Sequence, residues 1–118
     1  MIIMGIDPGI GITGYSFLEY KNDKYYLITS GSIQTDKKAH HPKRLAELKN
    51  DIDFLLDKYS PDCASVEQLF FFKNQKTIIP VAQARGVILL SLEEHKIPMF
   101  EYTPLVVKQT ITGHGRAQ

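Results

Sequence analysis

The sequence predicts an α/β fold built on a five-stranded mixed sheet. Two observations support this class. Three short apolar or alternating segments follow one another closely near the N-terminus, and two further strand-like segments come later, each preceded by a helical pattern. The predicted order is β-β-β-α-β-α-β-α. Because helical crossovers join the later strands, these strands should run parallel to the first.

Length and composition are typical of one globular domain. The chain has 118 residues, 43% of them hydrophobic and 23% charged, which suits a single core spanning residues 1–118. The one cysteine, Cys63, excludes an intrachain disulfide and a thiolate zinc cage. No segment approaches the ~18 apolar residues of a membrane span, and no basic leader opens the chain. We therefore expect a cytoplasmic protein without membrane contact.

The first three strands are predicted from residues 2–34. Residues 2–6 form an apolar run that stops at Asp7-Pro8-Gly9, which is typical of a central strand buried on both faces. Residues 13–20 alternate in polarity, and the polar residues 21–24 form a turn before a third strand at 25–32. Strands in such close succession indicate an antiparallel meander.

The first helix is predicted to begin at Pro42, whose missing N–H suits a helix start, and to end before Pro61. Its apolar stripe, at steps of mostly three and four, consists of Leu45, Leu48, Ile52, Leu55, Leu56 and Tyr59. A fourth strand is expected at residues 63–67.

A second helix is predicted at residues 77–95, with Pro80 in its first turn. Its apolar residues lie on most sides, which is typical of a helix buried between layers, and Ala82 and Gly86 leave a flat strip for close packing. A fifth strand should occupy residues 99–102. Thr103 and Pro104 then suit the cap and first turn of a third helix that reaches about residue 112.

Two carboxylates end predicted parallel strands. Asp7 follows the first strand and Glu67 ends the fourth, and ligands of open α/β sheets bind beyond the carboxyl ends of such strands. If the strands are neighbours, the carboxylates converge and need a cation between them, since no Lys or Arg adjoins either in the sequence. Oxygen ligands favour Mg²⁺ or Mn²⁺, the ions that clamp phosphodiesters during hydrolysis. The alternative is that both side chains are ordinary solvated strand ends.

An aromatic and basic segment follows Glu67. Residues 70–72 are three phenylalanines, with Lys73, Asn74 and Lys76 after them. An exposed aromatic beside cations can stack on an unpaired base while the lysines hold phosphate, and Phe70 is the strongest candidate. Phe71 and Phe72 could equally belong to the core.

The later part of the chain is also the basic part. Residues 1–67 carry eight Lys or Arg and ten Asp or Glu, whereas residues 68–118 carry six and three. Lys108, on the predicted third helix, and Arg116, in a glycine-spaced tail, lie in this half. They are candidate DNA contacts, although an isolated surface charge of this kind is commonly only solvated.

Blocks along the whole chain resemble the RuvC family of Holliday junction resolvases. They occur in the family's order and spacing and comprise Gly5-Ile6-Asp7-Pro8-Gly9, Thr13-Gly14-Tyr15, Val66-Glu67-Gln68 with Phe70 and Lys73-Asn74, Gln83-Ala84-Arg85-Gly86, Glu101-Tyr102-Thr103-Pro104, Val107-Lys108-Gln109, Thr112-Gly113 and Gly115.

The resemblance implies a ribonuclease H-like fold and a homodimer that nicks two symmetric strands of a four-way DNA junction with Mg²⁺, for which Mn²⁺ could substitute. It implies that Asp7 and Glu67 are catalytic metal ligands, that Phe70 enters between bases at the junction centre, and that Lys108 lies near the scissile phosphate. A branch-migration motor complex is a possible partner.

The resemblance stops short of the family's last helix. That helix carries a further acidic or histidine ligand and an aspartate, and another lysine follows the position of Gln118. We therefore expect a domain incomplete at its C-terminus, which folds and dimerises but cuts DNA poorly or not at all.

Two alternatives remain open at this stage. The chain could be a non-catalytic DNA-binding or dimerisation module that retains Phe70 and the lysines. It could also be a nucleotide-binding relative of the actin and sugar-kinase fold, in which Gly9, Gly11 and Gly14 would cradle phosphates.

Overall fold

The computed structural model describes residues 1–9, 11–68 and 75–102. The elements in this part of the chain are β1 (Ile2–Asp7), β2 (Ile12–Lys21), β3 (Lys24–Gln34), α1 (His41–Tyr59), β4 (Cys63–Glu67), α2 (Gln75–Glu94) and β5 (Met99–Tyr102). This order agrees with the predicted one as far as β5. The predicted helix at 103–112 lies outside the described residues. No helix in the described ranges is long and apolar enough to cross a membrane.

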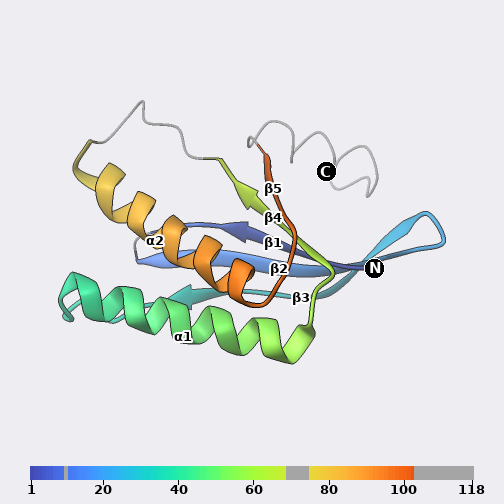
Figure 1. The fold of residues 1–118 in the computed structure, drawn as a ribbon, viewed down its shortest axis with the longest axis horizontal. Coiled ribbons are helices and arrows are strands. Elements are labelled where there is room, and N and C mark those ends of the chain that lie inside the picture. Colours follow the sequence, from blue (N-terminus) through green and yellow to red (C-terminus); the bar gives the residue numbers. More distant parts are fainter. Residues whose placement is uncertain (10, 69–74, 103–118) are drawn as a thin grey trace.

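The five strands form one mixed sheet in the order β3-β2-β1-β4-β5 (Figure 1). β1 pairs antiparallel with β2, and β2 pairs antiparallel with β3, as the predicted meander requires. β4 pairs parallel with β1, and β5 pairs parallel with β4, because α1 and α2 serve as the crossovers. The predicted mixed sheet is therefore confirmed, and β1 is its central strand.

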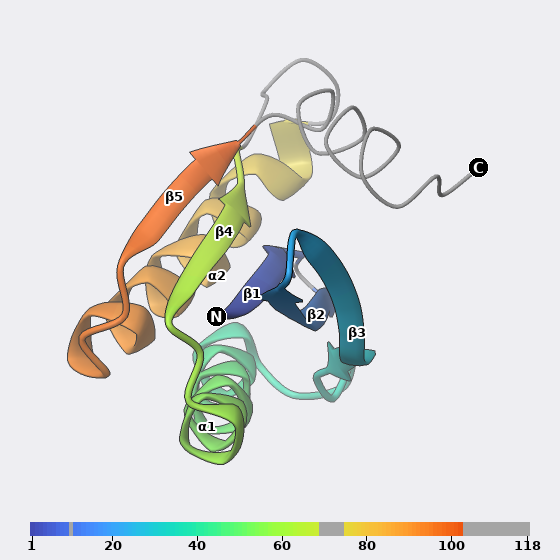
Figure 2. The same ribbon diagram turned by 90° about the vertical axis from the view of Figure 1, so that its right-hand side faces the viewer.

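The core lies between the sheet and the two helices, which run side by side (Figures 1 and 2). Alternate residues of β1 and β4 enter it: Met4, Ile6, Ala64 and Val66 are all buried. The residues between them lie on the opposite face and are only half-buried or exposed. The prediction that β1 is buried on both faces was therefore wrong, because α1 and α2 cover a single face of the sheet.

Helix α1 has the boundaries that its sequence predicts. Proline occupies its first turn, and Ser60 ends it in the left-handed conformation with its N–H donated to the carbonyl of Leu56. The predicted stripe faces the sheet, with Leu48, Ile52 and Leu56 fully or almost fully buried. Tyr59 stacks on Phe17 of β2 with a centroid separation of 4.4 Å.

Helix α2 corrects two predictions. It begins at Gln75, so Pro80 is its sixth residue and lies inside the helix, not in its first turn. Ala84, Ile88 and Leu92 enter the core at steps of four, but Ile79 is 67% exposed and Leu90 is 49% exposed. The helix is thus a surface helix with an apolar outer side. The flat strip at Ala82 and Gly86 is also exposed, and a β-carbon at Gly86 would meet no atom within 4 Å.

Candidate active site

Asp7 and Glu67 end neighbouring parallel strands in matching register. Ile6 of β1 pairs with Val66 of β4, and each carboxylate is the next residue along its strand. Because Ile6 and Val66 are buried against the helices, the pleat directs Asp7 and Glu67 to the opposite face of the sheet. Asp7 is exposed there and Glu67 is half-buried. The structure therefore brings the two carboxylates together at the carboxyl edge of the sheet.

The two carboxyl groups are close enough to share a proton. A hydrogen bond with Asp7, partial burial and the negative charge of Asp7 together raise the pKa of Glu67 from 4.5 to about 7. A proton on Glu67 thus relieves the repulsion that two adjacent carboxylates would otherwise suffer. A bound cation would do the same without the proton, which makes the pair a natural cation site.

Small residues lie beside Asp7 on the same face. Gly14 of β2 pairs directly with Asp7, and a β-carbon at Gly14 would lie 3.7 Å from the Asp7 β-carbon. Gly5, two residues before Asp7, faces Ser16, whose hydroxyl oxygen is 3.0 Å from the position of a Gly5 β-carbon. Small side chains therefore surround Asp7 on this face of the sheet.

The donor set suits a hard divalent ion. Both groups supply only carboxylate oxygens. Oxygen ligands of this kind suit Mg²⁺ and Mn²⁺ better than they suit zinc. Within residues 1–9, 11–68 and 75–102, no cluster of three or more His, Cys, Asp or Glu could hold a metal. An ion held by this pair would complete its coordination with water and substrate phosphate, as Mg²⁺ commonly does.

The remaining candidate residues fall largely outside the described part of the chain. This applies to Phe70, Lys73, Asn74, Lys108 and Arg116. Lys76 is the second residue of α2, the helix that follows β4.

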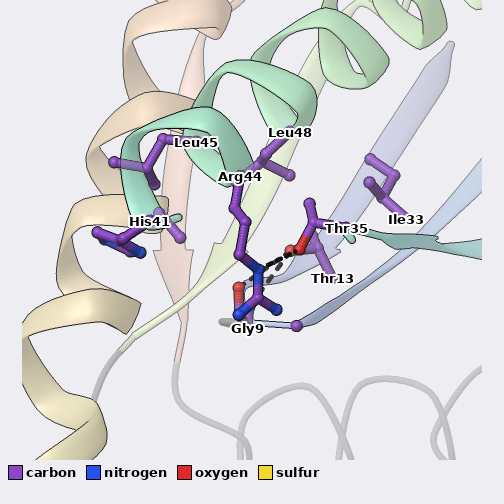
Figure 3. Close-up of a pocket in the computed structure, with 10 residues that line it drawn as sticks. Gly9, Thr13, Ile33, Thr35, His41, Arg44, Leu45 and Leu48 are labelled. Atoms are coloured by element: carbon purple, nitrogen blue, oxygen red, sulfur yellow. Dashed lines mark hydrogen bonds between the residues drawn. The ribbon is translucent and has the colours of Figure 1, made fainter. Parts of the chain in front are cut away.

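The turn after Asp7 is held by side chains for which the sequence predicts no such role. The hydroxyl of Thr13, which is 2% exposed, lies 3.4 Å from both the N–H and the carbonyl oxygen of Gly9. The N–H of Thr35 donates to the Gly11 carbonyl at 3.2 Å, and Arg44 Nε donates to Thr35 Oγ1 at 3.0 Å. Figure 3 shows these side chains around a cavity of about 10 Å³, room for about one water molecule.

A cavity lining of this kind has no simple sequence pattern. Gly9 and Thr13 belong to the blocks that carry the family resemblance, but Thr35 and Arg44 lie in segments with the sequence pattern of an ordinary loop and an ordinary helix face. Only the packing of α1 against the sheet brings them to the turn.

A mixed sheet of this order, with its helices on one face and two carboxylates at the carboxyl ends of neighbouring parallel strands, is a ribonuclease H-like fold. The family profile described as "Crossover junction endodeoxyribonuclease RuvC" matches residues 3–118. The chain therefore belongs to the RuvC family of crossover junction endodeoxyribonucleases, as the sequence resemblance indicated.

Individual relatives agree with this assignment. The chain is 50% identical over 118 residues to a crossover junction endodeoxyribonuclease RuvC of Petrotoga mobilis, covering 100% of this chain and 72% of that protein. It is 48% identical over 117 residues to the RuvC of Halothermothrix orenii, covering 99% and 71%. The structure of T. thermophilus RuvC in complex with a Holliday junction substrate superimposes with a TM-score of 0.86 at 25% identity, covering 95% of this chain and 72% of that one.

Proposed function

We propose that this chain resolves four-way DNA junctions by metal-dependent nicking of two symmetric strands, with Asp7 and Glu67 as its metal-binding carboxylates. The observation that carries the proposal is the matching register of β1 and β4, which places both carboxylates at one edge and on one face of the sheet. Mg²⁺ is the proposed ion, with Mn²⁺ as a substitute. The T. thermophilus relative of the same fold was solved with a Holliday junction substrate, which supports this substrate class.

The mechanism requires that both carboxylates be ionised. A bound divalent ion would activate the attacking water and stabilise the charge that develops on the phosphate oxygens. Asp7 and Glu67 would hold this ion, and Glu67 must release its proton to do so. Because the pKa of Glu67 is raised in the metal-free protein, proton and cation compete for the same oxygens.

The residues after Glu67 are the proposed contacts to DNA. Phe70 follows Glu67 by three residues, so the chain keeps their Cα atoms within about 11 Å of each other. An aromatic ring at this distance from the acidic pair could stack on a base near the scissile phosphate. Lys73, Asn74 and Lys76 would hold the backbone on the same side, and Lys108 and Arg116 are proposed as further phosphate contacts.

A homodimer is the proposed assembly. A four-way junction has two equivalent strands to cut, and a two-fold dimer presents two equivalent sites. The exposed outer side of α2, with Ile79, Ala82, Gly86 and Leu90, offers an apolar surface that a second copy could cover. A branch-migration motor is a further proposed partner. We propose a cytoplasmic location, since the substrate is cellular DNA.

A junction-cleavage assay tests the function. The purified chain is incubated with a synthetic four-way junction and Mg²⁺ or Mn²⁺, and slow symmetric nicking is expected, because the described residues supply only two carboxylates to the ion. Asp7→Asn and Glu67→Gln should abolish nicking while leaving junction binding intact. Asp51→Asn, which removes an exposed carboxylate from α1, is the matched control and should cut like the unaltered chain.

The same assay separates the alternative function. Junction binding that persists without nicks at any metal concentration would identify a non-catalytic DNA-binding or dimerisation module. The observation that favours this alternative is that the described residues supply only two carboxylates to the proposed metal.

A further inference from the structure

Hydrogen bonds at two of the described residues, Gly9 and Gly11, fasten the turn between β1 and β2. Thr13 contacts both backbone polar groups of Gly9 through its hydroxyl. Thr35, just past the end of β3, donates its backbone N–H to the carbonyl of Gly11. The side chain of Thr35 in turn accepts a hydrogen bond from Arg44 in the first turns of α1. A chain of contacts therefore leads from α1 to the turn that immediately follows Asp7 (Figure 3).

Arg44 supports the turn by direct contact as well. Its Nη2 lies 3.1 Å from the position that a β-carbon of Gly11 would take, so the guanidinium packs against the backbone at Gly11. One edge of the guanidinium bonds Thr35 while another rests on the turn. A lysine could form the first contact but lacks the planar group for the second.

We propose that Arg44 is a positioning residue for the acidic pair, which it holds in place by bracing the Gly9–Gly11 turn against α1 through Thr35. This inference rests on the proposed role of Asp7 and Glu67 as metal ligands. Asp7 is the last residue of β1, and only Pro8 separates it from Gly9. Carboxylates that share a metal must be held within about 0.5 Å of their working positions, so a loose turn next to one of them weakens binding.

The geometry explains why α1 supplies this brace. The helix is fixed to the sheet by Leu48, Ile52 and Leu56, all buried in the core. Arg44 lies four residues before Leu48, one helical turn earlier, and is itself half-buried. Because its helix is fixed to the core, the guanidinium of Arg44 holds the turn in a constant position relative to the sheet.

The first experiment measures the turn directly. Amide hydrogen exchange is compared between the unaltered chain, Arg44→Met and the control Lys43→Met, which removes an exposed charge from the neighbouring position. In Arg44→Met, the amide of Thr35 should exchange at least about tenfold faster, because its acceptor at Gly11 is no longer held. The amides of Leu48 and Ile52 should be unchanged, and Lys43→Met should leave all of these rates unchanged.

The second experiment measures the consequence for the metal. Free Mn²⁺ is counted by electron paramagnetic resonance, and the dissociation constant is expected to rise about tenfold in Arg44→Met, at the low end of the effect of outer-shell partners. Thr35→Val should produce a smaller rise, because Arg44 keeps its direct contact with the turn at Gly11. The double variant should bind Mn²⁺ no more weakly than Arg44→Met alone, since Thr35 acts only through Arg44. Arg44→Lys should fall between the unaltered chain and Arg44→Met. Junction affinity without metal should stay within about twofold.

The outcomes distinguish the two proposals. If the unaltered chain binds no Mn²⁺, the proposed function fails and the positioning role fails with it. If the unaltered chain binds Mn²⁺ and Arg44→Met binds it equally well, Arg44 has no positioning role and the proposed function stands. Unchanged exchange at Thr35, or additive effects of the Arg44 and Thr35 substitutions, would likewise overturn the inference.

Discussion

Replacing Asp7 by asparagine should shift the titration of Glu67. The substitution keeps the size of the side chain and removes its negative charge. In the unaltered protein, the hydrogen bond with Asp7, partial burial and the charge of Asp7 raise the pKa of Glu67 to about 7. The amide of an asparagine can donate a hydrogen bond to ionised Glu67, so the first and third causes disappear and only the burial remains.

The size of the shift follows from these causes. The pKa of Glu67 should fall from about 7 to within about one unit of its ordinary value of 4.5. At pH 7, ionisation of Glu67 should therefore rise from about one half to more than about nine-tenths. The titration must be compared in the metal-free state. A bound cation would displace the Glu67 proton in the unaltered chain and in Asp7→Asn alike.

Carbon-detected NMR of the Glu67 carboxyl group measures this titration. The unaltered chain and Asp7→Asn are titrated without metal, and Asp51→Asn is again the control because Asp51 is an exposed residue of α1. A Glu67 that titrates near 4.5 in the unaltered chain would refute the reasoning, since the two carboxyl groups could not then be in contact. An unchanged raised pKa in Asp7→Asn would show that burial alone is responsible.

Three further predictions concern the acidic pair, the turn and the core. Because the pKa of Glu67 is raised in the folded chain, the stability that its proton contributes without metal is complete below pH 4.5 and is lost as the pH rises through about 7. The melting temperature of the metal-free chain should therefore fall across this pH range. Saturating Mg²⁺ should remove this loss. A β-carbon at Gly9 would overlap the carbonyl oxygen of Ile12, so Gly9→Ala should displace the turn and abolish junction nicking, with circular dichroism to check that the fold persists. Ile52 is fully buried, so Ile52→Ala should lower the free energy of unfolding by about 2–5 kcal/mol in urea titrations, whereas Phe54→Ala, at a 62% exposed position, should cost less than about 1 kcal/mol.

Local signals in the sequence were sufficient for most of the fold. The strands at 63–67 and 99–102 have the predicted boundaries. Each is a short segment that follows the clear end of a predicted helix. The first helix was equally accessible, since a proline starts it and a clear stripe faces the core. Parallel pairing of the later strands followed from chain connectivity alone.

Properties that depend on tertiary packing were harder to predict. The second helix is apolar around most of its circumference, so its sequence does not say which sides are covered, and Ile79 and Leu90 proved to be exposed. The convergence of Asp7 and Glu67 could be predicted only on condition that their strands are neighbours. The brace formed by Thr35 and Arg44 could not be predicted, because it joins two segments that come together only when α1 packs on the sheet.

The central position of β1 has a consequence for how the protein is made. Asp7 is synthesised 60 residues before Glu67, and all of β2, β3 and α1 lie between them. A ribosome must therefore release the whole meander and its first crossover before the second acidic strand can dock, so affinity for divalent ions should arise late and in one step during translation. Until that moment Asp7 lacks its partner carboxylate, so the proposed metal site, and with it the proposed cleavage of DNA, is absent from the nascent chain.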